Sequence, residues 1–152
     1  MAEVTRRTRA TPREVFAVLA DGWVYSTWVV GASRIRDVDD GWPVTGSRIH
    51  HSFGAWPVML DDTTSVLECV PERLLRLEAR GWPFGQATIE LTLEPDDEGC
   101  LIRMVEDASQ GPGRLVPELA RRAVLVPRNH ESLKRLCYLA EGRAQAAERR
   151  AR

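Results

Sequence analysis

The chain has 152 residues, and a hydrophobic fraction of 43% with a charged fraction of 28% is typical of one soluble globular domain, not of a disordered or fibrous chain. It carries 21 basic and 22 acidic residues, so its net charge of −1 provides no positive field to attract a phosphate backbone. We therefore expect no nucleic-acid partner.

No apolar stretch approaches the roughly 18 residues that a membrane-spanning helix needs, and residues 1–10 lack the apolar core of a signal peptide. We expect no membrane insertion and a location in the cytoplasm. The three cysteines are an odd number, and the spacing of Cys69, Cys100 and Cys137 fits neither a disulfide framework nor a zinc motif. We expect buried free thiols, no metal and no cofactor.

The first predicted elements are an edge strand and a short helix. Residues 2–9 alternate weakly and carry threonine and valine, which permits an opening strand at the edge of a sheet. Thr11, Pro12 and Glu14 then form the pattern of a capping box with proline at the first helical position. We expect this helix to stop at Asp21-Gly22, where glycine can adopt the left-handed conformation.

A second short helix and a series of strands follow. Residues 23–30 are too aromatic for a surface loop and place their apolar side chains at helical spacing. Six strand-length segments separated by short polar turns predict an antiparallel meander, because parallel strands would need crossover helices for which there is no room. These segments are 33–38, 47–53, 63–70, 73–80, 86–94 and 100–106.

The alternation of apolar and polar residues predicts that one face of this sheet is exposed to solvent and the other is apolar. In segment 86–94 the apolar residues Ala87, Ile89, Leu91 and Leu93 alternate with threonines and glutamates. A sheet with one strongly apolar face must be covered by another layer.

The predicted cover is a long amphipathic C-terminal helix. Pro127 lies inside its pattern, so we expect either a kink there or a short helix followed by a longer one. Residues 144–152 contain no apolar anchor, and we expect them to fray beyond a single domain of residues 1–143. The predicted buried stripe, at spacings of four and three, is Leu119, Ala123, Val126, His130, Leu133, Cys137 and Ala140.

One helix across a strongly curved sheet leaves space that its side chains do not fill, so this order of elements implies an interior cavity. The chain resembles the helix-grip fold of the START-like (SRPBCC) superfamily, which includes the polyketide cyclase, dehydrase and lipid-transport group, and it looks like a bacterial branch of that group. The resemblance covers about residues 3–142, and its most specific segments are 11–23, 41–47, 81–85 and 129–136.

The resemblance implies an α+β helix-grip fold. A curved antiparallel sheet of about seven strands would wrap around a long C-terminal helix, with two short helices after the first strand. The competing cone-shaped fold of nuclear-transport-factor-like proteins places its helices early and ends on the sheet, so the long terminal helix decides against it. The group shares no universal catalytic motif, and the resemblance implies activity less strongly than fold.

Five tryptophans lie near predicted element ends: Trp23, Trp28, Trp42, Trp56 and Trp82. Aromatic side chains in such places either line the mouth of a cavity or close the ends of the core. Two of them, Trp28 and Trp56, are the strongest candidates for ligand contacts. The other predicted ligand-binding residues face the same interior, and they are Ile49, Phe53, Ile89, Leu91, Met104, Val126 and Leu133.

Three residues are candidate catalytic groups. Adjacent His50 and His51 point to opposite faces of a strand and cannot share a metal ion, and the phase of the strand directs His51 inward. His130 lies in the apolar stripe of the last helix. For each inward histidine, the alternatives are a hydrogen-bonded core residue or a group that transfers protons or orients a ligand.

The third candidate, Glu106, follows Ile102 and Met104 in phase and is expected to point inside. Burial would raise its pKa unless it is paired. Beside His51 or His130 it would form an acid/base couple for dehydration or aldol-type cyclisation. The alternative is a strand-end residue that turns outward or binds an arginine such as Arg34 or Arg103.

The sequence contains no nucleophile elbow, P-loop or dinucleotide fingerprint. Three functions remain open. The first is binding or transport of a small hydrophobic or aromatic metabolite by a monomer or homodimer. The second is a cofactor-independent enzyme of the aromatase, cyclase or dehydratase type, and the third is an interaction domain with a collapsed cavity.

Overall fold

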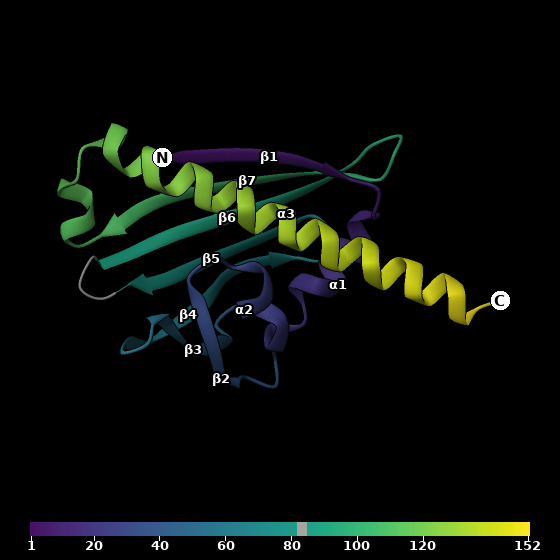
Figure 1. The fold of residues 1–152 in the computed structure, drawn as a ribbon, viewed down its shortest axis with the longest axis horizontal. Helices are drawn as coiled ribbons and strands as arrows, with labels where there is room; N and C mark the ends of the chain where they lie inside the picture. The colour runs from purple at the N-terminus through teal and green to yellow at the C-terminus, as the bar shows by residue number, and fades with distance from the viewer. Residues whose placement is uncertain (82–84) are drawn as a thin grey trace.

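The computed structural model describes residues 1–81 and 85–152, and its elements follow the predicted order (Figure 1). The first half contains β1 (Ala2–Thr8), α1 (Pro12–Leu19), η1 (Gly22–Val24), α2 (Tyr25–Trp28), β2 (Ala32–Val38) and β3 (Arg48–Ala55). The second half contains β4 (Val58–Val70), β5 (Leu74–Gly81), β6 (Gly85–Pro95), β7 (Cys100–Gln110), η2 (Pro112–Leu115) and α3 (Glu118–Arg150).

Within the described ranges the strands form one seven-stranded antiparallel sheet in the order β1-β7-β6-β5-β4-β3-β2. Figure 1 shows α3 lying across one face of this sheet, where it contacts β1, β7 and the two short helices α1 and α2. This arrangement is the α+β helix-grip fold, and the predicted edge position of the first strand is confirmed. None of the helices in the described ranges is long and apolar enough to span a membrane.

The capping box at the start of α1 is present. The Thr11 hydroxyl accepts a hydrogen bond from the Glu14 backbone N–H (3.2 Å), and the Glu14 carboxylate accepts one from the Thr11 N–H (2.8 Å). The predicted left-handed stop at Gly22 is wrong, because the helix ends on right-handed Ala20 and Gly22 begins η1. Gly22 is needed for space instead, since a Cβ there would lie 2.6 Å from Val38 Cγ1.

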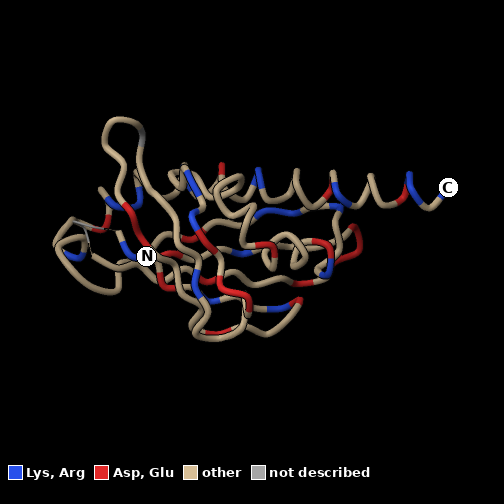
Figure 2. The backbone as a smooth tube through the Cα atoms, turned by 90° about the horizontal axis from the view of Figure 1, so that it is seen from below, with Lys and Arg blue, Asp and Glu red and all other residues tan. Residues whose placement is uncertain are grey.

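Helix α3 is continuous from Glu118 through Pro127 to Arg150, so the expected alternative of a short helix followed by a longer one is wrong, and the kink at Pro127 stays a prediction. Residues 144–150, for which fraying was expected, continue this helix, and Figure 2 shows its last turns extending alone beyond the sheet. Proline removes only one backbone donor from a helix, and the buried contacts that follow Pro127 hold the chain against the sheet. These buried residues are Asn129, Ser132, Leu133, Leu136, Cys137 and Ala140.

The prediction of which α3 residues are buried is wrong in the first half of the helix. Leu119 is 83% exposed, Ala123 and His130 are also exposed, and the buried face is centred on Asn129. An α-helix turns by about 100° per residue. His130, one position after Asn129, consequently lies at the edge of the buried face and points to solvent.

The outer face of the sheet carries a chain of ion pairs across five strands. Arg76 on β5 binds Glu68 on β4 and Glu90 on β6, with N···O distances of 2.7 Å each. Arg103 on β7 binds Glu3 on β1 at 2.8 Å and approaches Glu90 at 4.0 Å. These contacts follow the strand order, so they support the observed register.

Candidate functional site

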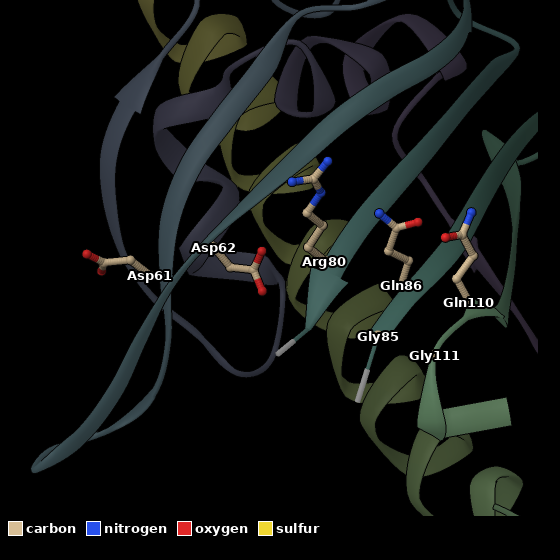
Figure 3. A pocket seen from close by; sticks show the side chains of 7 residues that line it. All are labelled: Asp61, Asp62, Arg80, Gly85, Gln86, Gln110 and Gly111. Atoms are coloured by element: carbon tan, nitrogen blue, oxygen red, sulfur yellow. The ribbon is translucent and has the colours of Figure 1, made fainter. Parts of the chain in front are cut away.

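The strands β4 and β5 part at one end of the sheet. Their ladder runs from the pair Val70–Leu74 to the pair Thr64–Ala79, beyond which β4 continues beside β3 and β5 continues beside β6. A cleft of about 360 Å³ lies at this fork. Its lining comes from four strands and the segment after β7, and consists of Asp61, Asp62, Arg80, Gly85, Gln86, Gln110 and Gly111 (Figure 3).

One wall of the cleft is acidic and is held by an arginine from β2. Asp61 accepts a hydrogen bond from the Ser52 hydroxyl (2.8 Å) and lies 3.4 Å from Arg36 Nε. Arg36 Nη2 donates to the backbone carbonyls of His51 (3.4 Å) and Asp62 (3.3 Å). The positive charge of Arg36 therefore lies beside the Asp61 carboxylate and the backbone of Asp62.

A buried hydrogen-bonded group lies next to the acidic wall. Thr64 Oγ1 lies 2.8 Å from His51 Nε2 and 3.3 Å from the Tyr25 hydroxyl, and the rings of Tyr25 and His51 stack with centroids 5.6 Å apart. All three residues are buried, with at most 3% of their surface exposed. Asp62 is the Cα partner of His51 across β3 and β4, so it connects this group to the cleft.

Burial sets the protonation of the group. Desolvation lowers the pKa of His51 below the ordinary 6.5, although the charge of Asp62 opposes this shift. Desolvation also raises the pKa of Tyr25 to about 12. At neutral pH the group therefore consists of a neutral imidazole, a phenol and the Thr64 hydroxyl.

The hydrogen bonds leave one ring nitrogen of His51 without a partner. Within the described residues Nδ1 is buried and forms no hydrogen bond. A neutral imidazole carries one N–H and one lone pair, so either a donor or an acceptor is unsatisfied at Nδ1. An unpaired buried polar atom costs free energy, and this atom is suited to a hydrogen bond with a water or ligand group.

Glu106 points inward as predicted, but its partner differs from those expected. Its carboxylate accepts two hydrogen bonds from Arg128 Nη2 (3.0 and 2.9 Å) and one from Asn129 Nδ2 (2.8 Å). Neither Arg34 nor Arg103 binds it, and His130 is exposed. The structure forms no contact between Glu106 and His51 among the described residues, so the predicted acid/base couple is not assembled.

Most predicted ligand-binding residues lie in the packed interior. Trp28, Ile49, Ile89, Leu91, Met104 and Leu133 are buried, and Phe53 and Val126 are half-buried against them. None of these described residues lines the cleft at the fork, and their role in ligand binding stays a prediction.

Two tryptophans do not fit the prediction of an aromatic mouth. Trp56 is 86% exposed in the turn between β3 and β4, so it does not line the interior. Trp42 Nε1 donates to the Leu19 carbonyl (3.0 Å) and fastens a loop to α1. Trp82 lies outside the described residues.

The inner face of the sheet is less filled near the fork. In register, Thr64 pairs with Ala79, Ala79 with Ala87, and Ala87 with Ala108, so three alanines lie side by side on β5, β6 and β7. All three are half-buried, whereas the next inner row contains the buried side chains of Leu77 and Ile89. Small side chains therefore occupy less of the inner face here than Leu77 and Ile89 do in the next row.

The polyketide cyclase / dehydrase and lipid transport family matches residues 1–141. The chain belongs to this family. No curated protein matches it. The fold described above is the START-like fold that the sequence resembles.

Solved structures share this fold at low sequence identity. Protein NE0264 from Nitrosomonas europaea has a TM-score of 0.73 and 15% identity, with 94% of this chain and 95% of that chain covered. Protein CV1439 from Chromobacterium violaceum has a TM-score of 0.71 and 20% identity, covering 91% and 96%. The di-domain ARO/CYC StfQ from the steffimycin biosynthetic pathway has a TM-score of 0.73 and 13% identity, covering 94% and 51%.

Sequence reasoning missed Asp62, Thr64, Arg80, Gln86 and Gln110. They come together because of strand register and the fork, which no local pattern shows. A weak signal was present. Ala79 and Ala87 are the inward-facing residues nearest the fork on β5 and β6, and alanine has the smallest apolar side chain. Among the described residues, no group of three or more histidines, cysteines or carboxylates is arranged to hold a metal ion.

Proposed function

We propose that the protein binds a small hydrophobic or aromatic molecule at the fork between β4 and β5, in the cleft and on the neighbouring alanine row. The observation that carries this proposal is the 360 Å³ cleft next to half-buried Ala79, Ala87 and Ala108. This volume lies within the roughly 300–1,000 Å³ of small-molecule sites. The family described above supports ligand binding in general.

Polar groups would orient the molecule. The cleft supplies Arg80, Gln86 and Gln110, and the buried group of Tyr25, Thr64 and His51 lies beside Asp62. A few polar groups in a largely apolar pocket are the usual means of fixing a ligand's orientation. A second cleft, of about 250 Å³ near Phe16 and Cys69, lies apart from these groups.

The test uses the neutral fluorescent probe N-phenyl-1-naphthylamine and the full chain. We expect Ala87→Leu, which fills the middle of the alanine row, to weaken probe binding by about tenfold or more. Ala123→Leu makes the same change at an exposed position of α3 and should leave affinity unchanged. Equal affinity of both variants and the unchanged protein would contradict binding at the fork.

A second candidate function is catalysis without a cofactor, of the cyclase or dehydratase type. It is favoured by His51, a neutral buried imidazole that forms a hydrogen bond with Thr64 and stacks on the Tyr25 ring. One nitrogen of this imidazole has no partner in the described part of the chain. Such a group can accept a proton from a bound substrate. If the protein is an enzyme, His51→Gln should abolish turnover of a polyketide substrate while the affinity for that substrate is retained.

Location in the cytoplasm and a monomeric or homodimeric state remain predictions. Size-exclusion chromatography with light scattering would determine the oligomeric state.

A further inference from the structure

Arg80 is a cation in the cleft that has no counter-ion among residues 1–81 and 85–152. It is exposed, and its guanidinium forms no ion pair or hydrogen bond within the described residues. Other arginines of the sheet are engaged, since Arg76 and Arg103 each bind carboxylates on the neighbouring strands. The Asp61 carboxylate in the same cleft already pairs with Arg36.

Two carboxamides extend the row that Arg80 begins. Arg80 is the Cα partner of Gln86 across β5 and β6, and Gln86 is the partner of Gln110 across β6 and β7. Residues paired in this way lie about 5 Å apart on one face of a sheet. Figure 3 shows the three side chains standing beside one another on neighbouring strands, across the cleft from Asp61 and Asp62.

We infer that the ligand of this site is an amphipathic organic acid whose anionic group binds Arg80, with Gln86 and Gln110 as further donors. This inference rests on the proposed function. A guanidinium presents parallel N–H donors that match the two oxygens of a carboxylate, and the amide N–H groups of the glutamines donate to its remaining lone pairs. The apolar part of the molecule then lies toward Gly85 and Gly111, which line the same cleft.

The opposite wall limits the charge of the ligand. Asp61 and Asp62 on β4 repel a second negative group placed against them. Arg36 pairs with Asp61 and, among the described residues, forms no contact with the row on β5, β6 and β7. The site is therefore suited to a monoanion with its charge at the Arg80 wall and an uncharged body. A ligand with two anionic ends would meet unfavourable charge on β4.

A matched pair of probes tests the inference. 8-Anilinonaphthalene-1-sulfonate carries one anionic group, and N-phenyl-1-naphthylamine has the same aromatic skeleton without it. We expect Arg80→Gln to weaken binding of the anionic probe by about tenfold or more, as for loss of a charged hydrogen bond, and to leave the neutral probe within about twofold. Arg80→Lys, which keeps the charge, should restore part of the loss.

The control is Arg73→Gln, which removes an exposed arginine without an ion pair at the other end of β5. It should change neither probe's affinity. If Arg80→Gln leaves the anionic probe unaffected while Ala87→Leu still weakens the neutral probe, the inference is overturned and the proposed function stands. If Ala87→Leu has no effect on either probe, the proposed function fails and this inference fails with it.

Discussion

Thr64 and Ala79 are the last residues paired between β4 and β5, and the cleft opens directly beyond them. Thr64 also holds His51 and Tyr25 through its single hydroxyl. One residue therefore lies both at the apex of the fork and at the centre of the buried polar group. A substitution of Thr64 should therefore alter both the stability of the fold and the shape of the site.

Replacing Thr64 with valine should destabilise the protein by about 1–3 kcal/mol, because His51 Nε2 and the Tyr25 hydroxyl both lose a buried partner. Urea denaturation followed by far-ultraviolet circular dichroism measures this free energy of unfolding. Thr63→Val, at the half-buried neighbouring position, is the matched control and should cost much less. Equal costs for the two variants would show that the shared hydroxyl contributes nothing to stability.

Breaking the buried ion pair between Glu106 and Arg128 should be costly when only one partner is removed. Arg128→Met leaves the buried carboxylate with a single donor, from Asn129, and should cost about 3–5 kcal/mol. The double variant Glu106→Leu with Arg128→Met removes the uncompensated charge as well, so it should be more stable than Arg128→Met alone. Urea unfolding of both variants decides this, and a double variant less stable than Arg128→Met would contradict the pairing.

Stability should fall as the pH drops below about 6.5, the ordinary pKa of histidine. Burial lowers the pKa of His51 in the folded state. Just below pH 6.5 the unfolded chain therefore binds a proton at His51 that the folded chain does not bind. The stabilisation is therefore complete above pH 6.5 and is lost as the pH falls toward the folded-state pKa. The steepest possible loss is about 1.4 kcal/mol per pH unit from one group.

The measurement is the urea midpoint between pH 7.5 and 5.5 for the unchanged protein and for His51→Gln, which removes the titrating group. The variant should show a smaller decline. His50→Gln, at the half-buried neighbour that contacts Asp39, should keep most of the decline, because the charge of His50 is the smallest cause of the lowered pKa of His51. A decline that is the same in the unchanged protein and in His51→Gln would assign the pH dependence to other groups.

The three thiols should differ in their reaction with iodoacetamide. Burial raises the pKa of Cys100 to about 11 and also raises that of Cys137, and both side chains are buried. Cys69 is half-buried, with its pKa raised by a lesser degree of burial. Peptide mass spectrometry at pH 8 should therefore find Cys69 modified first, because the thiolate is the reacting form, and early modification of Cys100 would contradict its burial.

Local patterns predicted the elements well because their causes are local. The capping box of Thr11 and Glu14 and the alternation around Ile89 and Leu91 depend only on neighbouring residues. The inward direction of His130 was predicted wrongly because one residue along α3, a rotation of about 100°, separates buried Asn129 from exposed His130.

The candidate site was largely beyond sequence reasoning. Arg80, Gln86 and Gln110 come from three strands, and only the register places them in one row. Trp56 was expected at the interior because its strand was assumed to continue inward, whereas a turn at residues 56–57 exposes it. Glu106 was directed inward correctly, but its partner Arg128 lies on a different element and has no local signal.

Amide chemical-shift mapping tests binding at the fork most directly. N-phenyl-1-naphthylamine is titrated into the ¹⁵N-labelled full chain, and the shifted backbone amides are located in the sequence. We expect the largest shifts at Gln86, Ala87 and Gly111, which border the cleft and the alanine row. Shifts confined to Val44 and Thr45, beside the second cleft, with none at the fork, would contradict the proposed site.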